Sequence, residues 1–433
     1  MSATAPLKHI RIVAKRFLKI DKTYTDQFGN FQLSKRFPRK VTIVVKFKSR
    51  ESHGRHTVRS AHTTFAFWRS MYPMKKNIDT YRGNNLQNLN YNFEKGSTST
   101  KTRTRKWVAA VAYNTTEESR SFMSQNNMVQ LPDDLRLYLY TNAQQDNVPQ
   151  FDLIRRSNAP LLNQNRWLVS DIMQYGISSV IGTTALVTFL IVPNPFSVAA
   201  AFWYFSTIPT FPDIYIHYKT TDINSLTASK ISITTGQQLA LAYINEVEAT
   251  SIIQATDQYP SYIRSRGTGM AYSTWNEYIP FGTGTGGATY SGSNYNPQLI
   301  AIWQSFAQHF GFTIADQIYS TGVSDFELQG KQWISDVSKS SSLKYLEDFN
   351  PSITPPQDYF NWIPVGLIND LIDSSPDPVS SPVIDNVSGF TYYDIQIAFS
   401  NKPATMGEFK SHLKGIKPLQ TNQIQVLFNS YGY

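Results

Sequence analysis

Histidine is the side chain in this chain best suited to bind a transition metal, and three histidines lie close together: His53, His56 and His62. Three arginines interleave with them, at positions 50, 55 and 59. Their positive charges would repel a cation. The stretch therefore favours a solvated surface or contact with an anion over a metal site.

Two other groups of residues lack the spacing that their chemistry would need. Asp370, Asp373, Asp377 and Asp385 do not follow the spacing of a calcium-binding loop, so solvated loops are favoured for them. The run GTGTGG (282–287) lacks the Lys-Ser/Thr of a phosphate-binding loop and indicates a surface turn. The chain has no cysteine, which excludes disulfides, thiolate metal sites and cysteine nucleophiles.

Hydrophobic periodicity predicts the elements that would position these groups. Long helices are predicted over residues 56–71, 107–123, about 235–256 and 297–311. The last of these has Asn296 as its cap, Pro297 at its first position and Gly311 at its end. Strands are predicted at 135–140 and around 214–216, where apolar and other residues alternate.

Shorter helices are predicted near the C-terminus. One covers about 365–372, and a second begins at Thr405, where Glu408 completes a capping box, and ends at Gly415. The final segment, TNQIQVLFNSYGY, favours helix over strand.

The pattern of the N-terminal region predicts strands joined by a tight turn. Gly29 can adopt the positive φ of that turn, and Asp26 can cap it with its side chain. Phe31 and Leu33 then alternate with polar residues as on a half-buried strand. Further strands are predicted around Ile10 and Ile12 and over residues 41–48.

The pattern of residues 25–33, Thr-Asp-x-x-Gly-x-Phe-x-Leu, resembles the transthyretin-like (carboxypeptidase regulatory-like) β-sandwich. This module recurs in exported bacterial proteins as a regulatory or attachment domain. The resemblance implies a small β-sandwich over residues 1–52. An ordinary hairpin in an unrelated sheet is the alternative.

From about Arg55 to its end, the chain resembles exported bacterial proteins that join a zincin-like metallopeptidase domain to such a sandwich. The resemblance rests on residues 245–251 (NEVEATS), residues 304–307 (QSFA), and the segments VGLINDLID and DNVSGF. In the family pattern, a helix carries His-Glu-x-x-His and a later helix carries a further glutamate ligand. The two imidazoles and that glutamate hold zinc, and the motif glutamate activates water.

The residues that perform this chemistry are replaced here. Asn245 and Ala249 stand where the histidines would be, and Gln304 stands where the ligand glutamate would be. Of the first motif, only Glu246, the family's general base, and Ser251 are retained. Asn, Ala and Gln supply almost none of the affinity that imidazole and carboxylate have for zinc. The resemblance therefore implies a degenerate site with no metal, no cofactor and no catalytic residue.

Together these features predict an α+β protein, with a small N-terminal β-sandwich (1–52) followed by a larger, mostly helical zincin-like domain (53–433). We expect a binding or structural role, with a protein, peptide or glycan ligand held by the former cleft or by the aromatic-rich loop 266–296. The resemblance places the protein outside the cytoplasm, at the cell surface or secreted. The N-terminus shows no signal peptide, so export, with or without a lipid anchor, would need a leader that this chain lacks.

Charge and hydropathy indicate whether nucleic acid or a membrane is an expected partner. The first 106 residues carry 24 Lys and Arg against five acidic residues, within a net charge of +9 for the chain. These cations are dispersed among core-forming residues, so nucleic acid is not the expected partner. Residues 172–212 carry no charge, but their two apolar runs are shorter than the roughly 20 residues that span a bilayer. Buried core is expected there, without stable membrane insertion.

Two alternatives from other classes stay open at this point. Glu246, Glu248 and one of the scattered histidines could assemble an unconventional metallopeptidase site. A nucleic-acid-packaging viral capsid protein would account for the uneven charge, although successive capped helices do not suit a capsid jelly roll.

Overall fold

The computed structural model describes slightly more than half of the chain in detail and divides it into two compact units. The sheet unit comprises Ala5–Glu117 and Asp133–Ser225, and the helical unit comprises Glu118–Pro132 and Leu226–Tyr433. The described residues are 5–37, 40–50, 54–60, 72–82, 89–97, 100–140, 150–151, 214–217, 226–247, 297–319, 364, 366–372, 385–403 and 405–433. Residues 172–212 and 266–296, for which a buried core and a loop were predicted, lie outside this set.

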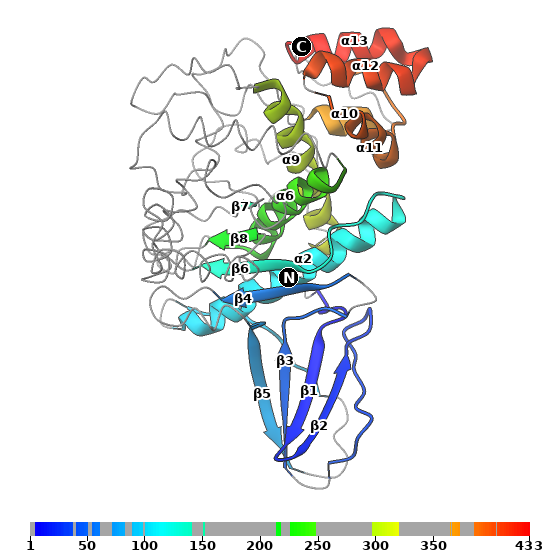
Figure 1. Ribbon diagram of the computed structural model, residues 1–433. Coiled ribbons are helices and arrows are strands. Elements are labelled where there is room, and N and C mark those ends of the chain that lie inside the picture. The colour runs from blue at the N-terminus through cyan, green and yellow to red at the C-terminus, as the bar shows by residue number, and fades with distance from the viewer. Residues whose placement is uncertain are drawn as a thin grey trace, which may run out of the picture. The chain divides into compact units, whose positions relative to one another are not determined.

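The first sheet of the sheet unit is antiparallel, with strand order β2-β1-β3-β5 (Figure 1). Its strands are β1 (Arg11–Arg16), β2 (Lys19–Tyr24), β3 (Val41–Lys46) and β5 (Lys75–Tyr81). The predicted strands around Ile12 and over 41–48 are confirmed, and Val41, Ile43 and Val45 are buried. The structure adds β2, which the sequence pattern did not reveal because its side chains are mostly exposed.

The turn after β2 has the predicted chemistry, but the segment that follows it is not a strand. Gly29 has φ +81°, and Asp26 Oδ1 accepts hydrogen bonds from the backbone N–H groups of Phe28 and Asn30, both at 2.8 Å. The strand prediction for Phe31 and Leu33 is wrong. This segment returns along β2 through side-chain contacts, such as Lys35 N donating to Asp21 Oδ2 at 2.8 Å, and adds no backbone ladder.

The second sheet has the order β4-β6-β8-β7. β4 (His56–Ser60), β6 (Leu135–Tyr140) and β8 (Ile214–His217) are parallel, and β7 (Gln150–Phe151) pairs antiparallel with β8. The strands predicted at 135–140 and around 214–216 are confirmed.

The helix predicted over 56–71 is wrong at its start, because His56–Ser60 is a strand. All five of its side chains are buried, as expected for a strand between covered faces. Such a strand lacks the alternation that distinguishes it from a helix in the sequence. Residues 61–71 lie outside the described set.

Backbone hydrogen bonds connect the two sheets within this unit. Val58 N donates to Phe47 O at 3.0 Å, and Met74 N donates to Val58 O at 2.8 Å. The first sheet also takes β5 from beyond residue 52, so it draws on residues from both sides of the predicted domain boundary.

The long helix predicted over 107–123 is confirmed. α2 (Lys101–Gln125) extends it at both ends. Most of its side chains from Val108 to Arg120 are buried, including several polar ones.

Among its described residues, the helical unit has two long helices and a set of short ones (Figure 1). The long helices are α6 (Ala228–Val247) and α9 (Pro297–Tyr319). The short ones are α10 (Leu367–Ile372), α11 (Tyr392–Ser400), α12 (Met406–Ile416), the 3₁₀ turn Pro418–Gln420 and α13 (Thr421–Ser430). The helices predicted at 365–372, after Thr405 and in the final segment are therefore confirmed.

Several predicted helix ends differ from the structure. α6 begins at Ala228, earlier than the predicted Thr235. α12 continues through Gly415 to Ile416. Its cap at Thr405 accepts a hydrogen bond from Glu408 N, whereas the reciprocal capping box belongs to Thr391 and Asp394 at the start of α11.

Gly311 is a helix-packing residue, although the sequence suggested a helix end. α9 continues past it to Tyr319, and the reason is the approach of α6. A Cβ on Gly236 would lie 2.9 Å from Gly311 Cα, and a Cβ on Gly311 would lie 2.6 Å from Ile233 O. The two helices therefore cross backbone to backbone at a pair of glycines.

In coarse terms, the fold is mixed α/β, with a small antiparallel sheet near the N-terminus and helices predominating later in the chain.

The glycine crossing predicts a clear difference between two glycine substitutions. Gly311→Val should lower the free energy of unfolding by about 2 kcal/mol or more, because its side chain would overlap the α6 backbone. Gly415→Ala, with nothing within 4 Å of its Cβ, should raise it by about 0.5 kcal/mol. Urea unfolding followed by circular dichroism measures both, and equal effects would contradict the crossing.

Candidate functional site

The helix pair α6–α9 is the framework on which the predicted site residues lie. The rings of Tyr243 and Phe306 stack with centroids 5.5 Å apart and planes at 27°. Gly236 and Gly311 touch further along. Because the residue numbers rise on one helix as they fall on the other, the two helices run antiparallel.

This geometry fixes the height of the predicted site positions along the helix pair. Asn245 lies two residues beyond Tyr243 on α6, and Gln304 lies two residues before Phe306 on α9. At 1.5 Å of rise per residue, position 245 lies about 3 Å along the helix axis from position 243, and position 304 lies about 3 Å from position 306. Because the helices are antiparallel, both displacements have the same direction. The structure thus brings positions 245 and 304 to the same level of neighbouring helices. Position 245 does not face α9, because nine residues at about 100° each place it on the side of α6 opposite Gly236, the residue that touches α9.

Of the other two predicted positions, one lies among the described residues. Glu246 lies on the last turn of α6 with an exposed side chain. Ala249, together with Glu248, lies outside the described residues.

A buried polar cluster that the sequence did not suggest joins α9 to α11. His309 on α9 is 1% exposed, and its Nε2 lies 2.8 Å from the Tyr392 hydroxyl on α11. Burial lowers the pKa of His309 to about 3, so its imidazole is neutral at pH 7. Burial also raises the pKa of Tyr392 to about 12. The pair is a neutral hydrogen bond that joins α9 to α11.

A second contact joins α11 to α6. The Tyr243 hydroxyl donates to Gln396 Oε1 at 3.0 Å, and Val129 N donates to the same oxygen at 2.6 Å. Hydrogen bonds from α11 therefore hold both long helices, as well as the segment that follows α2.

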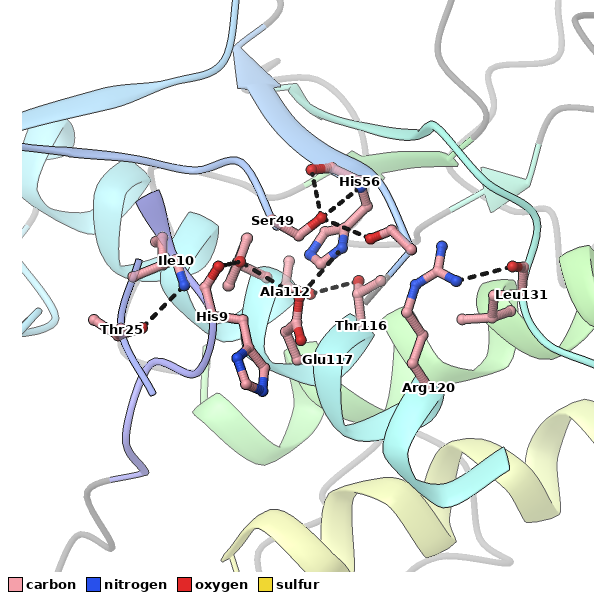
Figure 2. Close-up of polar contacts among 12 residues, drawn as sticks. His9, Ile10, Thr25, Ser49, His56, Ala112, Thr116, Glu117, Arg120 and Leu131 are labelled. Carbon is pink, nitrogen blue, oxygen red and sulfur yellow. Dashed lines mark hydrogen bonds and ion pairs between the residues drawn. The ribbon is translucent and has the colours of Figure 1, made fainter. Parts of the chain in front are cut away.

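The sheet unit contains its own buried cluster around His56 (Figure 2). His56 is fully buried on β4, and its Nδ1 lies 3.6 Å from Glu117 Oε1 on α2. Its backbone N–H donates to Ser49 Oγ at 2.8 Å. The imidazole also lies against the ring of Tyr113, with centroids 4.5 Å apart.

The Tyr113 side chain extends this cluster toward the first sheet. Its hydroxyl donates to the carbonyl of His9 at 3.0 Å, and burial raises the pKa of its phenol well above the usual value. The expectation of a solvated surface is therefore wrong for His56, since the strand carries it into the core. His53 and His62 lie outside the described residues.

A buried arginine anchors the turn that follows α2. Arg120 is 6% exposed, and its guanidinium donates to the carbonyls of Leu131 at 2.9 Å and Pro132 at 2.7 Å (Figure 2). These bonds fix the path of the chain after the helix. They also occupy the guanidinium in a structural role.

Two of the aspartates assigned to solvated loops are instead buried. Asp370 on α10 is 0% exposed, and the Tyr431 hydroxyl donates to its Oδ2 at 2.6 Å. Asp385 is 7% exposed and accepts from Val387 N at 3.0 Å. The prediction failed because the Asp370 carboxylate joins α10 to Tyr431 after α13, and the Asp385 carboxylate caps the backbone two residues further on. Asp373 and Asp377 lie outside the described residues.

The described part of the chain shows neither a metal-binding group nor a membrane-spanning helix. Its His, Asp and Glu residues form no group of three placed to hold a metal ion. Among its helices, none combines the length and apolar character needed to cross a bilayer.

Comparison with known proteins gives no match: no family model, no curated protein and no solved structure is similar to this chain.

The depressed pKa of His309 predicts a pH-dependent stability. Below its ordinary value of 6.5, the unfolded chain binds a proton that the folded chain excludes until about pH 3. Stability should therefore fall as the pH drops from 6.5, by about 1.4 kcal/mol per pH unit from this group. His309→Gln should lose that part of the slope while keeping a hydrogen-bonding side chain. Urea unfolding at pH 7.5, 6, 5 and 4 tests this, and parallel curves for the two proteins would contradict it.

Proposed function

We propose that this chain is an exported bacterial binding protein, in which a transthyretin-like module precedes a zincin-like domain that has lost its metal ligands. The ligand would be a protein, a peptide or a glycan. The proposal combines the resemblance of the sequence with the placement of the long helices.

The order of elements supports the scaffold. A strand (β4), a long helix (α2), further strands and then α6 and α9 follow one another along the chain. A zincin-type site needs two long helices of this kind, one for the paired histidines and one for the later glutamate. The sheet β2-β1-β3-β5 offers four antiparallel strands to the N-terminal module.

The observation that carries the proposal is the replacement of the family's ligand residues at 245, 249 and 304, and the similar height of 245 and 304 on the antiparallel helices supports it. A metal held by two helices requires ligands at the same height, because zinc–ligand bonds are only about 2 Å long. This chain supplies an asparagine and a glutamine at those positions. Neutral amides there favour hydrogen bonding to a bound partner over coordination of zinc.

A metal-binding measurement on restored variants tests the shared level directly. Asn245→His, Ala249→His and Gln304→Glu together should create a zinc site. The matched control replaces Gln304→Glu by Gln317→Glu, which adds the same charge to α9 about 20 Å further along the helix. Competition with a fluorescent chelator should show zinc binding at least tenfold tighter in the first variant. Equal affinities would mean that the two helices do not share a site.

Measurements on the wild-type protein test whether zinc binding and peptidase activity have been lost. After loading with zinc and desalting, elemental analysis should find far less than one equivalent of metal, and casein should remain intact. One tightly held equivalent that disappears in Glu246→Gln would overturn the proposal and favour a working peptidase.

A further inference from the structure

The tip of the β1–β2 hairpin has an unusual composition. The register pairs Arg16 with Lys19, which leaves Phe17 and Leu18 as the two-residue turn. Phe17 is 95% exposed and Leu18 is 86% exposed. In Figure 1, this turn lies at the lower end of the first sheet. Two large apolar side chains thus project from the end of a hairpin.

The backbone at this turn is also strained. Phe17 has φ +30°, on the left-handed side where a residue with a bulky side chain is disfavoured. Two-residue hairpin turns favour Asn and Gly for this reason. Because both side chains remain exposed, no packing among the described residues offsets the strain. An exposed and strained apolar pair is instead expected where a site meets a partner.

Cations surround the apolar tip. The residues with exposed basic side chains at this end of the sheet are Lys15, Lys19, Lys35, Arg36, Lys40 and Arg82. Hydrogen bonds hold the segment carrying Lys35 and Arg36 beside the hairpin: Lys19 Nζ donates to Arg36 O at 2.5 Å, and Lys35 Nζ donates to Ile20 O at 2.7 Å. The nearby acids are the buried Asp21 and the exposed Asp79. The described surface here is strongly positive.

The shape of this tip favours a membrane over a protein partner. A specific protein interface usually buries about 800 Å² on each side, with an apolar centre. A convex turn of two side chains offers far less area. A bilayer needs no complementary shape, since apolar side chains can enter the acyl boundary while Lys and Arg meet lipid phosphates.

We propose that the Phe17–Leu18 turn is a peripheral membrane anchor. Its two side chains insert into the interface of an anionic phospholipid surface, and the basic residues around the tip bind the headgroups. The proposal requires neither the zincin-like assignment nor any spanning helix.

Vesicle flotation with the full chain tests this anchor. Wild-type protein should float with phosphatidylglycerol/phosphatidylcholine vesicles at 50 mM salt, and much less with phosphatidylcholine alone or at 500 mM salt. Phe17→Gly with Leu18→Asn places glycine at the position with positive φ and should preserve folding. This variant should bind the anionic vesicles at least tenfold more weakly.

A matched variant distinguishes anchoring by this turn from nonspecific adsorption of exposed apolar side chains. Phe28→Asn with Leu419→Asn removes two other exposed apolar side chains, 68% and 95% exposed, that lie outside this turn. It should bind anionic vesicles as the wild type does. Lys15→Gln with Lys19→Gln should weaken binding at 50 mM salt and reduce its dependence on salt.

Placement of the tip in the lipid provides an independent measurement. Fluorescence from Phe17→Trp, in a chain that also carries eight native tryptophans, should shift to shorter wavelength with anionic vesicles relative to the unchanged protein. Absence of vesicle binding, equal binding by the variant with Phe17→Gly and Leu18→Asn, or equal binding to neutral vesicles would each overturn the proposal. The first of these results would direct the search to a macromolecular partner.

Discussion

The close contact between α6 and α9 is the constraint on which the helical unit depends. Glycines at 236 and 311 remove the side chains that would hold the helix axes apart. The rings of Tyr243 and Phe306 can then stack on one side of the crossing. Because the helices are antiparallel, the same contact fixes the relative heights of every other pair of positions, including 245 and 304. The framework of the candidate site therefore follows from a backbone contact that involves none of its predicted residues.

Buried polar groups provide the second level of organisation, and they act separately in the two units. In the helical unit, His309 is held neutral by burial and bonded to Tyr392, while Gln396 accepts from Tyr243. In the sheet unit, His56 lies between Glu117 and Tyr113. A buried polar group without a partner costs free energy, so each cluster favours one arrangement of its neighbouring elements. These histidines support the fold and need no catalytic role to account for their burial.

The two proposals assign binding to different surfaces. One concerns the level of the long helices that carries Asn245 and Gln304, and the other concerns the convex tip of the first hairpin. Together they would assign ligand binding to one unit and membrane binding to the other. The uneven charge of the sequence suits this arrangement, since the basic residues of the N-terminal region include those around the apolar tip.

The sequence by itself determined the elements whose signals are local. The turn at Asp26 and Gly29, the strand at 135–140, the core of α2 and the start of α9 at Pro297 follow from capping, backbone preference and periodicity within a few residues. Tertiary structure decided what depends on distant partners. Gly311 has the composition of a helix end, yet α9 continues because Gly236 of α6 packs against it. His56 lies in a mostly polar stretch without strand alternation and becomes a buried strand residue because β6 pairs beside it and Glu117 reaches it from α2. The candidate site divides in the same way: the sequence supplies the residue types at 245 and 304, and only the antiparallel helix packing gives them a common level.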